Sequence, residues 1–234
     1  MPDRDVKRAG AGSPSEGRRQ RWQAHRQTRR DELVTAAIGA IRVHGAGVGM
    51  DEIAATAGIS KPILYRHFTD RADLWLAIAR QVTAELLAAM SVQLMQDRPP
   101  REMIAAVIDT YLGLIEDDTE IYRFVVHGSF ADRGMTTDLV YAHMALMAEQ
   151  VARVLGDRLR EAGVDSGGAE PWAHGMVGMV QAAADWWIDR RSMSRTALVD
   201  YLTALISAGV EGMFAGAIGG DASAVPLAVH SAFP

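Results

Sequence analysis

The most informative segment of the chain reads Met50-Asp51-Glu52-Ile53-Ala54-Ala55-Thr56-Ala57-Gly58-Ile59-Ser60-Lys61-Pro62-Ile63-Leu64-Tyr65-Arg66-His67-Phe68. It predicts two short helices, at about residues 50–57 and 61–68. Gly58 can take the left-handed backbone conformation that ends one helix and turns the chain sharply. Ser60 is a good N-cap for the second helix. Pro62 fits its first turn, where the missing N–H needs no partner.

The second predicted helix has one apolar face and one polar face. Leu64 and Phe68 are four residues apart, so they point toward the core together. The residues left facing outward are Lys61, Pro62, Tyr65, Arg66 and Thr69. A two-turn helix that exposes lysine, tyrosine and arginine suits the DNA major groove, which is about 12 Å wide. The alternative interpretation is a helical hairpin in some other all-α protein.

The rest of the chain favours an all-α fold, since helix formers dominate and no strand-type alternation occurs. An apolar stripe predicts a first helix that ends near His44-Gly45. Further helices are expected at about 71–95, 101–116, 119–128, 135–163, 169–190 and 195–215. Four parts follow: a disordered basic tail (1–20), a helix-turn-helix domain (21–75), a larger helical domain (76–216), to which the resemblance described below assigns effector binding and dimerisation, and a flexible tail (217–234).

Composition indicates a globular protein, because 49% of the 234 residues are hydrophobic and no apolar run is long enough to span a bilayer. The absence of cysteine fits a reducing cytoplasm. The net charge of −5 is unevenly divided: residues 1–80 carry +5 and residues 81–234 carry −10. This asymmetry suggests that the first part meets a polyanion, although a basic tail on an acidic protein would also produce it.

Here the sequence resembles the TetR (tetracycline-repressor) family of regulators. The resemblance covers about residues 29–80. It rests on a first helix ending at Gly45, on Ile53-Ala54 followed by Ala57-Gly58-Ile59-Ser60, and on Leu64-Tyr65-Arg66-His67-Phe68, with Arg71 and Leu74 after it. It implies an N-terminal three-helix DNA-binding domain fused to a C-terminal helical domain that binds a ligand and dimerises. The chain departs from the family pattern at Lys61-Pro62, where a small residue is common, and near Met50, where threonine is common.

The resemblance also implies individual roles on DNA. Ser60, Lys61 and Pro62 would approach base edges or phosphates. Lys61 and Arg66 are the candidates for reading bases. Phosphate contacts would come from Tyr65, His67 and Arg71, and such contacts set register and affinity rather than sequence choice.

Two of these assignments have plain alternatives. His67 could instead be a flanking core residue packed on Ile63. Arg26, Arg29 and Arg30 could enter the adjacent minor groove as an arm, or could form a solvated basic segment that adds only salt-dependent attraction.

The C-terminal part carries no catalytic motif, no zinc-type histidine pair and no nucleotide fingerprint, so no enzyme activity, cofactor or metal is expected. The acidic cluster Glu116-Asp117-Asp118-Glu120 could suggest paired carboxylates or a metal site. It sits at a predicted helix junction, where acidic residues simply suit the N-terminus of the next helix.

Methionine and aromatic residues are frequent in the C-terminal part. Such stripes are usually core, but methionine adapts its shape, and a cavity lined by it would suit an apolar ligand. The resemblance implies such a pocket under the 135–163 helix, for a lipophilic effector. The candidate effector-binding residues are Tyr111, Phe124, His127, His143, Met147, Met179 and Trp186.

The resemblance further implies a homodimer through the helices at about 169–190 and 195–215. Two copies related by a two-fold axis would read a palindromic double-stranded DNA operator. The sequence thus predicts a cytoplasmic, ligand-responsive repressor without a membrane partner. The competing interpretation is a small-molecule-binding helical protein whose helix-turn-helix is only structural.

Overall fold

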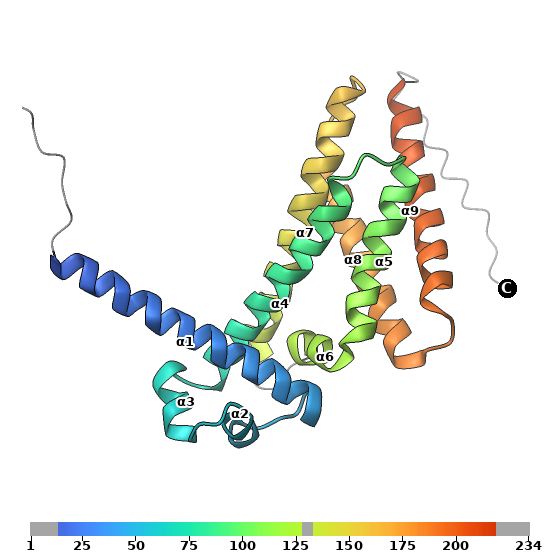
Figure 1. Cartoon of the computed structure of the whole chain (residues 1–234). Helices are drawn as coiled ribbons and strands as arrows, with labels where there is room; N and C mark the ends of the chain where they lie inside the picture. The colour runs from blue at the N-terminus through green and yellow to red at the C-terminus, as the bar shows by residue number, and fades with distance from the viewer. Residues whose placement is uncertain (1–13, 128–132, 219–234) are drawn as a thin grey trace, which may run out of the picture. The chain divides into compact units, whose positions relative to one another are not determined.

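The computed structural model describes residues 14–127 and 133–218, and every element in this part of the chain is helical (Figure 1). The elements are α1 (Pro14–His44), α2 (Met50–Thr56), α3 (Lys61–His67), α4 (Arg71–Leu94), α5 (Pro100–Asp117), α6 (Thr119–His127), α7 (Arg133–Glu161), α8 (Ala169–Arg190) and α9 (Arg195–Ile218). The predicted all-α fold is confirmed. Most predicted helix ends lie within two residues of the observed ones.

The chain divides into two compact units, Met1–Ile78 and Ala79–Pro234. The division falls inside α4, the helix in which the sequence places the boundary. It lies three residues beyond the boundary expected after residue 75.

In the first unit, α1, α2, α3 and the start of α4 enclose a small apolar core. The fully buried large side chains are Leu33, Ile41, Ile53, Leu64, Phe68, Leu74, Trp75 and Ile78. Burial of a leucine or isoleucine contributes roughly 1.5–3 kcal/mol. This core therefore fixes α3 through Leu64 and Phe68.

The first helix is longer than the sequence predicts. Residues 14–20 were expected to be disordered, but α1 begins at Pro14 and continues to His44. The sequence of residues 14–20 contains no apolar stripe, so its periodicity gives no signal for a helix there. The other end agrees with expectation, since Gly45 takes a φ of +83° and ends the helix. Residues 1–13 lie outside the described part.

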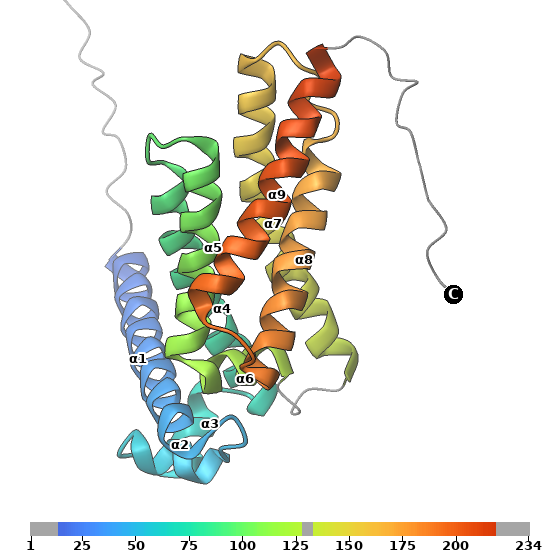
Figure 2. The same cartoon turned by 90° about the vertical axis from the view of Figure 1, so that its right-hand side faces the viewer.

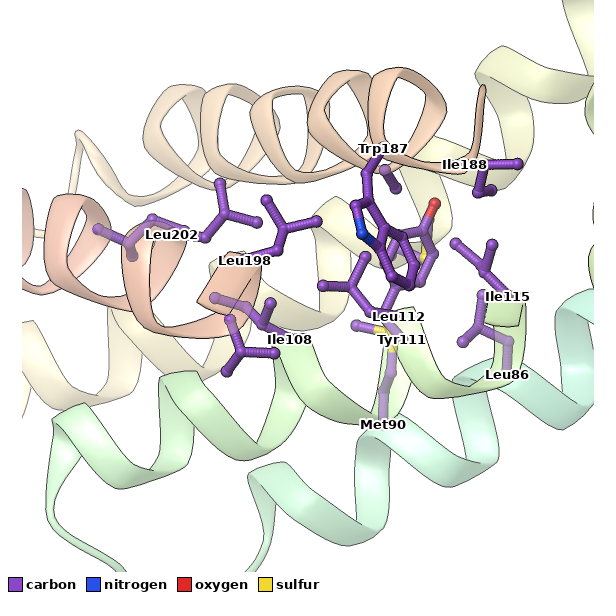
Figure 3. Close-up of a cluster of buried hydrophobic side chains, with 14 residues drawn as sticks. Leu86, Met90, Ile108, Tyr111, Leu112, Ile115, Trp187, Ile188, Leu198 and Leu202 are labelled. Carbon is purple, nitrogen blue, oxygen red and sulfur yellow. The ribbon is translucent and has the colours of Figure 1, made fainter. Parts of the chain in front are cut away.

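The second unit is a helical bundle in which α5 packs against α9 and α7 packs against α8 (Figure 2). Its main apolar core draws on five helices, and Figure 3 shows Trp187 of α8 between side chains of α5 and α9. The Trp187 indole nitrogen donates a hydrogen bond of 2.8 Å to the backbone oxygen of Met193. The Arg191 guanidinium lies 4.5 Å from the indole ring centroid. These contacts hold the turn between α8 and α9.

The ends of α8 and α9 can be compared with the helix ends expected from the sequence. α8 covers Ala169–Arg190, as predicted, and Ser194 caps α9 by accepting a 3.2 Å hydrogen bond from the Ala197 N–H. The tail was expected to begin at residue 217, but α9 continues through Ile218. Residues 219–234 lie outside the described part.

The acidic cluster between α5 and α6 takes part in ion pairs. Glu116 accepts hydrogen bonds from Arg191 at 3.1 Å and from Arg195 at 3.2 Å. Arg195 also lies 2.9 Å from Asp109. These pairs join α5 to the start of α9. No group of three potential metal ligands occurs among the described residues.

Candidate nucleic-acid interface and ligand cavity

The turn between α2 and α3 is built by Gly58 and the backbone around it. Gly58 takes a φ of +64°, and the Ile59 N–H donates to the Ala54 carbonyl at 3.0 Å. Ser60 precedes α3 with an extended backbone, but its side chain makes no capping hydrogen bond. Its carbonyl instead accepts from the Ile63 and Leu64 N–H groups, at 2.9 and 3.2 Å. The predicted side-chain cap is therefore absent, and the Ser60 hydroxyl stays at the exposed start of α3.

The outward face of α3 is the one that the sequence predicts. Leu64 and Phe68 are fully buried beneath it. The exposed residues on and beside the helix include Ser60, Lys61, Pro62, Tyr65, Arg66 and Thr69, together with the apolar Ile63. Tyr65 keeps 42% of its surface exposed. The arrangement presents cationic and hydroxyl groups together on one short helix.

Lys61 is not isolated on this face. Its Nζ lies 2.9 Å from Oδ2 of Asp51, at the start of α2, and both side chains are solvent-exposed. The hydrogen bond to Asp51 raises the pKa of Lys61, so the ammonium form is favoured. An exposed pair of this kind contributes little to stability, so a phosphate can replace the carboxylate at small cost.

His67 lies at the end of α3 and is half-buried. Partial burial lowers the pKa of His67, and the neighbouring Arg66 and Arg29 guanidiniums lower it further. The imidazole is therefore mostly neutral near pH 7. A neutral imidazole can still donate one N–H to a phosphate.

Of the arginines assigned to DNA, Arg29 is exposed on α1, where it pairs with Glu32 at 2.6 Å. Arg30 is directed into the first unit. It binds Asp73 and the His67 carbonyl oxygen, and its guanidinium lies 4.2 Å from the Phe68 ring centroid. The sequence does not predict this internal role for Arg30.

Arg71 opens α4 and is half-buried. It donates a hydrogen bond of 2.7 Å to the Val48 carbonyl, and desolvation by burial lowers its pKa. An arginine remains charged despite such a shift. Arg71 therefore stays cationic at the start of α4.

The second unit contains a cavity of about 470 Å³ between α4, α5, α7, α8 and α9. Its walls are mostly apolar and include Met103, Val107, Met147, Val180, Ile206 and Phe214. This volume and chemistry are typical of small-molecule sites. The cavity lies where a ligand would touch five helices at once.

Two of the seven candidate effector residues, Tyr111 and Met147, line this cavity. Phe124, Met179 and Trp186 do not line it. Phe124 is buried in the core, Met179 packs against the main core cluster, and Trp186 keeps 41% of its surface exposed. The side chains of His127 and His143 lie outside the described part of the chain.

Sequence reasoning missed the charged residues of the cavity, Arg98, Arg158 and Glu161. Arg98 lies in the loop between α4 and α5, and the other two lie in the last turn of α7. No local pattern marks a charged residue as part of a cavity, so only the packing of the bundle could reveal them.

Asp185 of α8 accepts a hydrogen bond of 2.5 Å from the Tyr122 hydroxyl. Burial raises the pKa of Tyr122, and it also raises the pKa of Tyr111. Both tyrosines therefore keep their protons at neutral pH. Tyr111 is also one of the residues that line the cavity.

None of the described helices combines the length and the apolarity needed to cross a membrane. A tight turn between two short helices, with a buried inner face and a cationic outer face, defines a helix-turn-helix protein of the DNA-binding class.

Comparison with known families identifies the chain more closely. Residues 33–78 match the bacterial regulatory proteins of the tetR family, and residues 85–218 match the tetracyclin repressor-like C-terminal domain. The chain is 40% identical over 192 residues to an uncharacterized HTH-type transcriptional regulator of Mycobacterium tuberculosis, covering 82% of this chain and 81% of the relative. The chain therefore belongs to the TetR family, and it is a transcriptional regulator rather than an enzyme.

Other relatives are more distant. The HTH-type transcriptional activator FasR of Mycolicibacterium smegmatis is 28% identical over 186 residues, covering 79% of this chain and 83% of FasR. Among solved structures, the regulator FadR from Bacillus subtilis in complex with stearoyl-CoA has a TM-score of 0.64 at 14% identity, covering 76% of this chain and 97% of FadR. This last likeness shows the fold alone.

Proposed function

We propose that this regulator is a homodimeric repressor that binds a palindromic DNA operator and is released from it by an apolar small molecule. The observation that carries the proposal is the outer face of α3, where Lys61, Tyr65 and Arg66 are exposed above the buried Leu64 and Phe68. A rigidly supported cationic helix can enter the major groove without reorganisation. Such a protein would act in the cytoplasm, where the chromosome lies.

A dimer is supported by the exposed side of α9. Tyr201 and Leu205 are one helical turn apart and keep 68% and 61% of their surfaces exposed. Large exposed apolar side chains that line up on one helix favour an interface. A single two-turn helix also reads too little sequence for a specific operator, whereas two copies read both halves of a palindrome.

An apolar effector is supported by the cavity in the second unit, with its walls of methionine, valine and isoleucine. The FadR structure, in which stearoyl-CoA is bound, offers a precedent on the same fold. A ligand that binds one arrangement of the dimer better than another shifts the population toward it. A coupling of about 1–3 kcal/mol between the ligand and operator sites is typical.

The test is selection of bound sequences from random duplex DNA with the full-length protein. The proposal predicts a palindrome whose half-sites are spaced by about one helical turn or a multiple of it. It also predicts that a cavity ligand lowers the affinity for this duplex about tenfold or more. Recovery of no sequence at all would contradict operator binding. A cavity ligand that leaves the operator affinity unchanged would contradict the release mechanism.

Transcription in vitro from a promoter that carries the selected site distinguishes the direction of control. Repression predicts that the protein lowers transcript yield and that the ligand restores it. The opposite result would assign activation, the role in the name of the FasR relative.

A further inference from the structure

The charged residues of the cavity point to a more specific ligand, and this inference rests on the effector role proposed above. We propose that the cavity takes a single-chain amphiphile with an anionic head group. The head is held by Arg98 and Arg158, and the tail extends inward toward Tyr111.

The charges of the cavity are confined to one end of the bundle. Arg98 precedes α5, whereas Arg158 and Glu161 lie in the last turn of α7. Figure 1 shows the α4–α5 loop and the end of α7 at the same end of the bundle. Arg158 and Glu161 are exposed there, so this end of the cavity faces solvent. The cavity therefore has a charged, open end and an apolar inner part.

Arg98 is the better candidate for the anion. Its guanidinium is half-buried and donates to the amide oxygens of Gln93, at 3.2 Å, and Gln96. These two partners are neutral amides, so neither of them compensates its positive charge. An arginine fork matches a carboxylate or phosphate in geometry as well as in charge.

Arg158 adds a second positive charge. Its only carboxylate partner among the described ion pairs is Glu161, at 4.0 Å, which is the outer limit for such a contact. Among the residues that line this end of the cavity, two guanidiniums and one carboxylate give a net positive charge. A ligand with a negative head group compensates that charge, whereas a cationic head would be repelled.

The inner part of the cavity is long rather than round. On α5 the lining runs from Pro100 to Tyr111, and on α7 from Met147 to Glu161. These stretches advance eleven and fourteen residues along their helices, about 16 Å and about 21 Å at 1.5 Å per residue. Apart from Tyr111, the described lining residues beyond the charged end are apolar. An extended alkyl chain fits this shape better than a compact ring system.

The experiment compares dodecanoate, dodecanol and dodecylamine, which share one tail and differ in head-group charge. Binding to the full-length protein is measured by titration calorimetry, below the concentration at which each compound forms micelles. Dodecanoate is expected to bind about tenfold or more tightly than dodecanol. Dodecylamine is expected to bind most weakly.

The variant Arg98→Gln is expected to reduce dodecanoate affinity to that of dodecanol, while dodecanol affinity stays unchanged. Arg101→Gln is the matched control, because Arg101 is exposed at the start of α5 and does not line the cavity. It should leave the preference for dodecanoate intact. Unchanged dodecanol binding by Arg98→Gln also verifies that the variant is folded.

Equal binding of acid and alcohol, or an unaltered preference in Arg98→Gln, would overturn the head-group assignment while leaving an apolar effector site in place. Failure of all three compounds to bind would overturn the proposal of an amphiphilic ligand. Operator selection would still test DNA binding independently.

A comparison with dodecanoyl-CoA distinguishes two sources of negative charge. If dodecanoyl-CoA binds more tightly than dodecanoate, the arginines bind the phosphates of coenzyme A. If it binds more weakly, they bind the carboxylate of a free fatty acid.

Discussion

The Lys61 ammonium nitrogen lies 2.9 Å from the Asp51 carboxylate, across the turn between α2 and α3. A residue that we propose contacts DNA is thus paired with a carboxylate of its own unit. In the proposed complex, phosphate binding by Lys61 would compete with this pair. We therefore expect the operator affinity to depend on Asp51 as well as on Lys61.

Replacing Asp51 with asparagine is expected to tighten DNA binding several-fold. The change removes a negative charge from the proposed DNA-facing surface and frees Lys61 to bind a phosphate. Each additional phosphate that the protein neutralises makes the slope of log K against log salt concentration steeper by about 0.9. Fluorescence anisotropy with a labelled duplex at several salt concentrations measures both effects. Weaker binding by Asp51→Asn would show instead that Asp51 positions Lys61 for contact.

Replacing Arg30 with alanine is expected to destabilise the protein by about 2 kcal/mol, because it removes a charged hydrogen-bonded pair with Asp73. Only 28% of each of these two side chains is exposed, so solvent screens the pair weakly. Denaturant unfolding measures the loss. Arg29→Ala is the control, and should cost less than about 0.5 kcal/mol because its pair with Glu32 is exposed. Equal effects of the two variants would contradict the internal role of Arg30.

His67 predicts a pH dependence of DNA binding. Partial burial and nearby arginines lower the pKa of His67, so the free protein holds this imidazole neutral near pH 7. A bound phosphate favours the protonated form and raises the pKa again, so binding takes up a proton. DNA affinity should therefore increase as the pH falls from about 7.5 to 6, the window in which histidine titrates.

His67→Gln should flatten this pH profile while keeping a hydrogen-bond donor. The folding stability of the free protein depends on pH in the opposite direction from DNA affinity. A lowered histidine pKa in the folded state means that stability is lost as the pH falls through the unfolded value of about 6.5. An identical pH dependence of DNA affinity in His67→Gln would place His67 away from the phosphates.

Leu205→Glu is expected to convert the proposed dimer to monomers, because it buries an unpaired carboxylate in an apolar interface. Sedimentation equilibrium measures the mass, and operator affinity should fall by about tenfold or more since one half-site is then read at a time. Val92→Glu, at an exposed position of α4, is the control and should remain dimeric. A dimeric Leu205→Glu protein would contradict the α9 interface.

The helices could be predicted from the sequence because their signals are local. Gly45 and Gly58 end two helices, Pro100 opens another, and apolar periodicity sets most of the rest. The exception is the start of α1, where residues 14–20 have no apolar stripe to detect.

The site could be predicted only in part. The exposed face of α3 follows from helical spacing, which is a local property. The pairing of Arg30 with Asp73 spans 43 positions in sequence, and the place of Arg98 at the cavity depends on how five helices pack. Such contacts arise from tertiary structure, so residue type and spacing do not predict them.

The most direct test of the account is the affinity of the double variant Lys61→Ala/Tyr65→Phe for the selected operator, beside the wild-type protein. Both side chains are exposed, so the variant should keep the wild-type unfolding midpoint. We expect the double variant to lose about tenfold or more in operator affinity and to show a shallower salt dependence. A folded variant that binds the operator as tightly as wild type would contradict the assignment of α3 as the helix that contacts DNA.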